Sequence, residues 1–218
     1  MDFSYVTGFA ALGDSFSAGL GAGAPFDQDQ FCARGTLAFP NIINQDERMG
    51  EPAHRTFQFL ACSGAKSKDV VEKQVPLMGN DQSLITMSIG GNDVGFADIL
   101  NVCVFQFTFD AGGDKACDDK LDEAKTTIQK DLSGALSATL NAVKPKLSTK
   151  KESLGILFVL GYAKFFEATS KQCDDVAWSF WWNVKQKQKL TTKRRGRMNE
   201  LVDNLNAVIR DAVKIAGP

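Results

Sequence analysis

Three apolar segments of this chain each run directly into a cluster of small or polar residues. The segments are residues 8–12, 56–61 and 84–89, and the clusters that follow them are residues 13–15, 62–65 and 90–93. Nearly continuous apolar runs of this length are typical of strands that are covered on both faces of a parallel sheet. Because the carboxyl ends of parallel strands meet at one edge of a sheet, we expect the three clusters to lie side by side.

The rest of the chain alternates strand and helix patterns. A fourth, almost wholly apolar strand is predicted at residues 154–160. Apolar residues at helical spacing predict one long helix over 119–143, ended by Pro145, and a second over 192–215. This alternation predicts an α/β fold with right-handed crossovers and a doubly wound sheet. With 218 residues, of which 44% are apolar, the chain is expected to form one domain over residues 1–218.

The three clusters contain the groups that acyl transfer needs. Ser15 supplies a hydroxyl nucleophile, Gly64 a backbone N–H, and Asn92 a carboxamide donor. With the N–H of Ser15 itself, these donors make a candidate oxyanion hole, in which each donor is typically worth roughly 3–4 kcal/mol. The alternative is three ordinary strand-to-helix turns, since Gly, Asp and Ser all favour turns.

The chain resembles the SGNH (GDSL-type) hydrolases, and most closely their secreted fungal and actinobacterial esterases and lipases. The resemblance rests on three blocks and two further segments: Gly13-Asp14-Ser15, Gly64 within 62–65, Gly91-Asn92-Asp93 within 88–93, residues 161–166 and residues 197–202. It implies a flavodoxin-like three-layer sandwich around a mostly parallel sheet of five strands, ordered 2-1-3-4-5. It also implies a serine hydrolase of carboxylic esters on lipid or acylated substrates, with catalytic Ser15, Gly64 and Asn92 and no metal or organic cofactor.

One departure from the family pattern concerns the general base. The family places a histidine near its C-terminus, whereas the one histidine here is His54, before the second strand. Six strand residues separate His54 from the turn after that strand by roughly 20 Å, and a base must lie within about 3 Å of its hydroxyl. His54 is therefore expected not to reach Ser15. The resemblance then implies that the last strand and the histidine segment are missing. Asp14 is expected to orient the turn, because adjacent turn residues point apart.

A second hypothesis is a non-catalytic relative that binds lipid or glycan with the same pocket. Sequence downstream of Pro218 would discriminate, since an Asp-x-x-His segment favours an enzyme fragment and a stop codon favours a degenerate paralogue. If strand 154–160 is an uncovered edge, the chain is also expected to dimerise or to be poorly soluble.

Five cysteines are present, and no pair has the Cys-x-x-Cys spacing of zinc or redox sites. Spacing alone leaves fifteen pairings open, and five reduced thiols are an alternative. The resemblance implies disulfides Cys32–Cys62 and Cys103–Cys117, which leaves Cys173 without a partner. Cysteine content and resemblance together predict secretion, although the first residues do not form a signal peptide.

Charge and composition narrow the range of partners. The net charge of −1 gives no overall field for nucleic acid, and no apolar run approaches the ~20 residues of a membrane span. Trp178, Phe180, Trp181 and Trp182 are expected either to anchor a loop on the core or to form a rim in transient contact with lipid. The basic residues within 185–197 are expected to be a solvated segment. Residues 19–24 fit the loose dinucleotide fingerprint, but they do not directly follow the strand, so they favour a loop.

Overall fold

The structure is a computed structural model, and it describes residues 3–106, 113–179 and 189–217. The chain divides into two compact units. The first contains Met1–Gly90, Gly134–Leu160 and Ala212–Pro218, and the second contains Gly91–Ser133 and Gly161–Asp211. The expectation of one domain over residues 1–218 stays a prediction.

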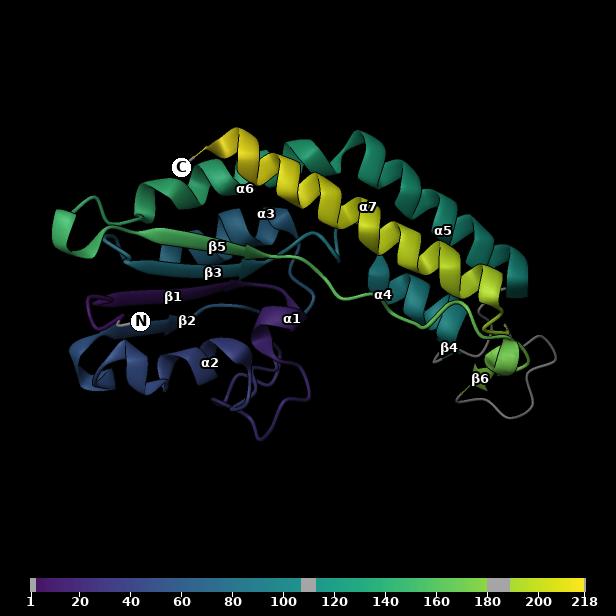
Figure 1. Cartoon of the computed structure of the whole chain (residues 1–218), viewed down its shortest axis with the longest axis horizontal. Helices are drawn as coiled ribbons and strands as arrows, with labels where there is room; N and C mark the ends of the chain where they lie inside the picture. Colours follow the sequence, from purple (N-terminus) through teal and green to yellow (C-terminus); the bar gives the residue numbers. More distant parts are fainter. Residues whose placement is uncertain (1–2, 107–112, 180–188, 218) are drawn as a thin grey trace. The chain divides into compact units, whose positions relative to one another are not determined.

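The first unit is built on a four-stranded parallel sheet (Figure 1). Its strands are β1 (Gly8–Gly13), β2 (Thr56–Phe59), β3 (Leu84–Ser88) and β5 (Ile156–Leu160), in the order β2-β1-β3-β5. Every residue of β1 and β3 is buried, which is why both strands are nearly continuous apolar runs. The α/β fold class and the four predicted strands are therefore confirmed.

Helices cover both faces of this sheet. In Figure 1, α2 (Phe39–Asn44) lies on one side and α3 (Ser67–Asp69) and α6 (Leu132–Val143) lie on the other. The short α1 (Ser15–Ala18) follows β1 directly, and the π-helix η3 (Val70–Gln74) continues α3. Five 3-10 turns complete the unit: η1 (Glu47–Met49), η2 (Pro52–His54), η4 (Val75–Leu77), η6 (Lys144–Lys146) and η7 (Lys151–Ser153).

The second unit is mainly helical. It contains α4 (Phe96–Ile99), η5 (Leu100–Val104), α5 (Gly113–Lys130), η8 (Lys171–Cys173) and most of α7 (Thr192–Ala216). β4 (Phe105–Gln106) and β6 (Trp178–Ser179) form a small parallel ribbon. The buried Arg195 of α7 donates to the carbonyl oxygens of Leu190, Glu167 and Ser170, so it fastens the loop around η8 to the helix.

Two features of the second half differ from the sequence prediction. The helix predicted over 119–143 begins earlier, at Gly113, and is interrupted at Asp131, so it forms α5 and α6. Buried leucines continue at helical spacing through the break, and the apolar pattern alone therefore indicates one helix. The β4–β6 ribbon was not predicted, because two residues per strand are too few for a periodic pattern.

Strand β5 is an edge of the sheet, as the sequence predicted. It pairs with β3 on one side, and its exposed side chains include Ile156 (41% exposed) and Phe158 (56% exposed). These two side chains line an apolar groove of about 390 Å³, whose other walls include Tyr5, Ile43 and Leu84. No charge or proline interrupts the strand, so it lacks the usual protection of an edge.

We therefore expect the 218-residue chain to self-associate with rising concentration, as measured by light scattering. A lysine on the exposed face, Phe158→Lys, should reduce the association because a charge opposes edge pairing. The matched control is Leu77→Lys, at an exposed apolar residue of η4 away from the edge, which should change nothing. A chain that stays monomeric at high concentration would contradict the expectation.

No helix within the described parts of the chain reaches the length and apolar character that a membrane crossing needs.

Candidate active site

Ser15 is the first residue of α1, directly after the turn that ends the central strand β1. Asp14 is the N-cap of this helix, and its carboxylate accepts the Phe16 N–H at 2.9 Å. Ser15 is half-buried, and neither its hydroxyl nor its backbone N–H has a hydrogen-bond partner among the described residues. Both groups are therefore available to a substrate.

A buried polar network fixes the turn to the neighbouring strand β3. The Asp14 N–H donates to the Ser88 carbonyl oxygen at 3.0 Å, and the Ser88 hydroxyl donates to Asp14 Oδ1 at 2.9 Å. The Ser17 hydroxyl accepts the Ser88 N–H at 3.1 Å. Asp14 is 2% exposed and is occupied as a cap and as an acceptor for Ser88, which agrees with the expected role of orienting the turn.

Gly64 lies in the loop that follows β2, next to the Ser15 turn. The Cys62 N–H donates to the Gly13 carbonyl oxygen at 3.0 Å, so the two turns are hydrogen-bonded to each other. Gly64 has φ +81°, a conformation that favours glycine, and a side chain added there would meet nothing within 4 Å. Its exposed N–H has no acceptor among the described residues, so this donor is also available.

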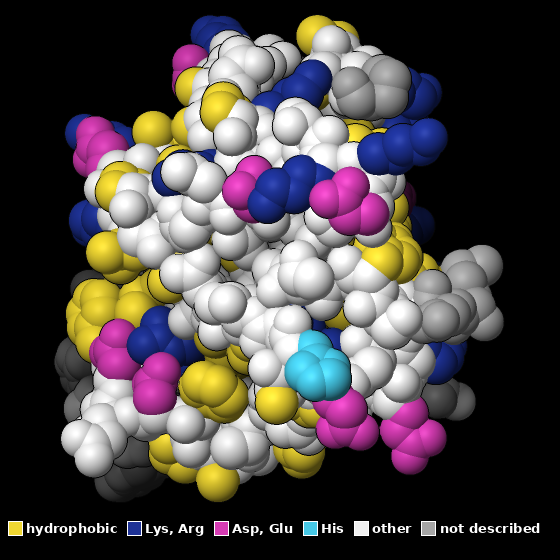
Figure 2. Space-filling model, turned by 90° about the vertical axis from the view of Figure 1, so that its left-hand side faces the viewer, with side chains coloured by type: hydrophobic (Ala, Val, Ile, Leu, Met, Phe, Trp, Pro, Cys, Tyr) yellow, Lys and Arg dark blue, Asp and Glu magenta, His cyan; other side chains and the backbone are white. Residues whose placement is uncertain are grey.

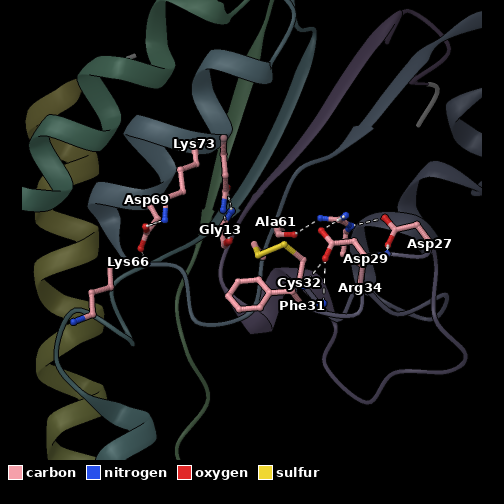
Figure 3. The surroundings of a disulfide bond; sticks show 12 residues. Gly13, Asp27, Asp29, Phe31, Cys32, Arg34, Ala61, Lys66, Asp69 and Lys73 are labelled. Atoms are coloured by element: carbon pink, nitrogen blue, oxygen red, sulfur yellow. Dashed lines mark hydrogen bonds and ion pairs between the residues drawn. A yellow bond between two sulfur atoms is a disulfide. The ribbon is translucent and has the colours of Figure 1, made fainter.

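The Gly64 loop is held by the Cys32–Cys62 disulfide, which is the pairing that the resemblance implies. Figure 3 shows Cys32 close to Gly13 and to Ala61. The Ser63 N–H donates to the Cys32 carbonyl oxygen, and Arg34 Nη1 donates to the Ala61 carbonyl oxygen. These three links tie one side of the Gly64 loop to the segment around Cys32.

Two carboxylates stabilise the segments on either side of this loop. Asp29 accepts the Cys32 N–H and faces Arg34, and these contacts hold the pKa of Asp29 below its usual value. Asp69, the last residue of α3, forms an ion pair with Lys73 and accepts the N–H of the N-cap Lys66, and these contacts lower the pKa of Asp69 (Figure 3). Both carboxylates are therefore ionised at neutral pH. Asp29 stabilises the segment around Cys32, and Asp69 stabilises the segment from Lys66 to Lys73 that follows the Gly64 loop.

Removing the disulfide with the double substitution Cys32→Ser and Cys62→Ser is expected to lower the free energy of unfolding by about 3–4 kcal/mol. This is the chain-entropy value for a separation of 30 residues. Urea denaturation measures the change. The control is Cys173→Ser, because Cys173 is exposed and forms no disulfide, and this variant should keep wild-type stability. Equal stability of all three proteins would contradict the expectation.

Asn92 belongs to the second unit and lies four residues after the end of β3. The Asn92 carbonyl oxygen accepts the Gly95 N–H at 3.3 Å, which closes the turn before α4. The preceding Gly91 N–H donates to the Tyr162 hydroxyl at 3.1 Å. Tyr162 is in turn held by Asn206 of α7, which bonds both its backbone N–H and its carbonyl oxygen. The convergence of Asn92 with Ser15 and Gly64 stays a prediction.

His54 lies at the opposite end of the sheet from Ser15. It ends η2, just before β2, and the first residue of β2, Thr56, pairs with Gly8 at the start of β1. Ser15 follows the far end of β1, six strand residues or roughly 20 Å away. Figure 2 shows the single histidine side chain of the molecule at the surface. The prediction that His54 does not reach Ser15 is confirmed.

Other sequence candidates have no role in this arrangement. The glycine-rich residues 19–24 form turns after α1. Within the described ranges, no group of three His, Cys, Asp or Glu residues is placed to hold a metal ion. Trp178 is exposed on β6, whereas Phe180, Trp181 and Trp182 lie outside the described residues, as do Lys185 and Lys187. The second disulfide, Cys103–Cys117, joins η5 to α5.

Four residues that hold the candidate turns were missed by sequence reasoning: Gln74, Ser88, Tyr162 and Asn206. Ser88 could have been found, because it is a polar residue inside an apolar strand next to a polar cluster. Gln74 and Asn206 gave no such signal, since a polar residue in a helix is usually solvated.

The comparisons with known proteins agree with this geometry. Residues 11–217 match the model of the GDSL-like lipase/acylhydrolase family. A lipase from Streptomyces rimosus and lipase 1 from Streptomyces coelicolor are each 30% identical to this chain over 93% of its length, and the chain spans 64% of each of these relatives.

Two solved structures are similar over 97% of this chain. One is phospholipase A1 from Streptomyces albidoflavus, with 31% identity and a TM-score of 0.75. The other is the extracellular lipase from Streptomyces rimosus, with 29% identity and a TM-score of 0.76. The chain covers 77% of each of these two proteins. With most of its length matched by the family model, the chain belongs to the GDSL-like lipase/acylhydrolase family.

Proposed function

We propose that this chain carries the nucleophile and oxyanion hole of a serine hydrolase of carboxylic esters. The observation that carries the proposal is the Ser15 turn. Its hydroxyl and N–H are unpartnered within the described structure, next to the equally unpartnered N–H of Gly64. Asp14 and Ser88 hold this turn rigidly, as preorganised catalysis requires.

In the proposed reaction, the Ser15 oxygen attacks the ester carbonyl carbon and the carbonyl oxygen becomes an oxyanion. The N–H groups of Ser15 and Gly64 and the carboxamide of Asn92 donate hydrogen bonds to that oxyanion. The alcohol then leaves, and water later cleaves the acyl-enzyme. A base must accept the serine proton, and His54 does not lie within reach of it.

The names of the relatives favour lipid esters as substrates. The similar structures are a phospholipase A1 and an extracellular lipase, and the curated relatives are called lipases. Together with the two disulfides, the extracellular relative supports secretion into an oxidising compartment. The exposed Trp178 supports transient contact with a lipid surface.

Covalent labelling of Ser15 tests the nucleophile separately from turnover. When Ser15 attacks a fluorophosphonate, an O–P bond forms, fluoride leaves, and the hydroxyl proton passes to water. Labelling is expected to be slow, because His54 does not reach the Ser15 proton. At completion we expect one adduct per chain by intact mass and its location at Ser15 by peptide mapping. The control Ser15→Ala should give no adduct. Labelling scattered over several exposed serines, or none in the wild type, would overturn the proposal.

The second candidate function is non-catalytic binding of lipid or glycan in the same pocket. The position of His54, the one histidine of the sequence, favours this function. His54 lies at the opposite end of the sheet from Ser15, so it does not serve as the general base of the serine. This function predicts that Ser15→Ala binds a phospholipid or an acetylated oligosaccharide as tightly as the wild type, while neither protein reacts with the fluorophosphonate. Calorimetric titration of both proteins separates the two candidates.

A further inference from the structure

Gln74, at the end of η3, makes an unusual pair of contacts with the strand that leads to Ser15. Its Oε1 accepts the Gly13 N–H at 2.8 Å, and its Nε2 donates to the Gly13 carbonyl oxygen at 2.8 Å. Gln74 is 4% exposed, and 61 residues separate it from Gly13 in the chain. One buried carboxamide thus satisfies both backbone groups of the residue two positions before the candidate nucleophile.

The end of β2 explains why Gly13 needs this partner. The last paired residues of β1 and β2 are Ala11 and Phe59, so Gly13 extends beyond the ladder on that side. No backbone carbonyl of the described residues after Phe59 accepts the Gly13 N–H, so without Gln74 this buried N–H would be left without an acceptor. The Gln74 side chain takes the place of the missing strand residue.

The Gly13 carbonyl oxygen is also the point where the two candidate turns meet. It accepts the Gln74 Nε2 and, at 3.0 Å, the Cys62 N–H of the loop that carries Gly64. A carbonyl oxygen has two lone pairs, and these two donors use both of them. Gln74 therefore holds the atom that sets the spacing between the Ser15 turn and the Gly64 turn.

Ser88 holds the same turn from the opposite side. Its carbonyl oxygen accepts the Asp14 N–H, and its hydroxyl donates to the Asp14 carboxylate. The turn is thus fixed to β3 by Ser88, to η3 by Gln74, and to the Gly64 loop by the Cys62 N–H. The Ser88 contacts orient α1, whereas Gln74 Nε2 bonds the carbonyl oxygen through which the two turns meet.

We propose that Gln74 is a positioning residue that keeps the Ser15 hydroxyl and the Gly64 N–H in the register needed for attack. This inference rests on the proposed function of Ser15. Loss of the carboxamide leaves the substrate pocket in place but shifts one turn against the other. A shift of this kind affects the chemical step more than binding, since a misplacement of about 1 Å can cost on the order of 100-fold in rate.

The experiment compares Gln74→Met with a matched control, Gln58→Met. The Gln58 carboxamide also bridges two backbone groups, accepting the Gly79 N–H at 2.8 Å and donating to the Leu77 carbonyl oxygen at 3.1 Å. Those contacts hold the turn before β3, at the other end of the sheet from Ser15. Both variants therefore lose the same kind of bonds, and only one loses them at the candidate site.

Fluorophosphonate labelling of Ser15 is measured over a range of probe concentrations, which separates probe affinity from the maximal labelling rate. We expect Gln74→Met to lower the maximal rate about 10- to 100-fold with affinity unchanged. Hydrogen exchange of the amides of residues 13–16 should accelerate in the same variant. Gln58→Met should keep the wild-type rate and the wild-type exchange of these amides. Thermal unfolding tests whether each variant is folded. If Gln74→Met does not fold, Gln74→Glu replaces it, because glutamate keeps the acceptor for the Gly13 N–H.

A folded Gln74 variant that labels at the wild-type maximal rate, or one that loses only affinity, overturns the inference. The failure of the proposed function looks different, because wild-type Ser15 then takes no label at all. In that case the exchange data still decide the role of Gln74. Faster exchange at residues 13–16 confined to the Gln74 variant supports its hold on the turn, and unchanged exchange overturns it.

Discussion

Hydrolysis of a p-nitrophenyl ester by these 218 residues is expected to be on the order of 10⁶ slower than by a family member that supplies a histidine to its serine. That ratio corresponds to about 8 kcal/mol of activation free energy. The physical reason is the proton on Ser15. Within the described structure its hydroxyl has no hydrogen-bond partner, and the one histidine of the sequence lies at the far end of β1.

Steady-state assays of the wild type, Ser15→Ala and His54→Ala measure this effect. The residual rate should change little in Ser15→Ala, because a serine without a base adds little, and the oxyanion hole and binding alone can leave about 10³- to 10⁴-fold catalysis over water. His54→Ala should match the wild type. Turnover near that of the histidine-containing family member, abolished by Ser15→Ala, would mean that another group among these residues accepts the proton.

The sheet was predictable from sequence because burial on both faces leaves a strong signal. Strands β1 and β3 are buried at every position. The sequence of each strand is therefore a nearly continuous apolar run, which ends where the polar cluster begins. Parallel pairing then brings the ends of β1 and β2 together without further information, and the Cys62–Gly13 hydrogen bond is the result. The candidate residues Ser15 and Gly64 follow from that topology.

The groups that hold those turns could not be predicted in the same way. Gln74 reaches Gly13 across 61 residues of sequence, and Asn206 reaches Tyr162 across 44. Each is one polar residue on a helix, and nothing in the periodic pattern separates it from a solvated one. The break at Asp131 was missed for a related reason, since the apolar spacing continues across it. The spacing of apolar residues indicates which face of a helix or strand is buried. Specific hydrogen bonds between side chains and distant backbone groups depend on how the elements pack in three dimensions, which the spacing does not indicate.

Gly13→Ala is expected to lower the free energy of unfolding by about 4 kcal/mol or more, from backbone strain and overpacking together. Gly13 has φ +119°, which side chains rarely adopt. An added Cβ would lie 2.1 Å from the Ser88 carbonyl oxygen and 2.9 Å from the Ser88 nitrogen, both backbone atoms of the buried strand β3. Neither atom can move without breaking the hydrogen bond that the Asp14 N–H donates to Ser88. Urea denaturation of the two proteins measures the loss.

Gly64→Ala separates the two causes, because it introduces the same methyl group at another glycine with positive φ, +81°, where nothing lies within 4 Å. It carries only the backbone strain, about 1–2 kcal/mol. The excess loss in Gly13→Ala is then the cost of pushing β1 and β3 apart at the candidate nucleophile. If the two variants are equally stable, the close approach of Gly13 to Ser88 is wrong, and with it the rigid turn on which the role of Ser15 depends. A much larger loss of stability in Gly13→Ala than in Gly64→Ala would show that Gly13 packs directly against the Ser88 backbone. That packing leaves no room for a side chain at Gly13, and it also fixes the start of α1.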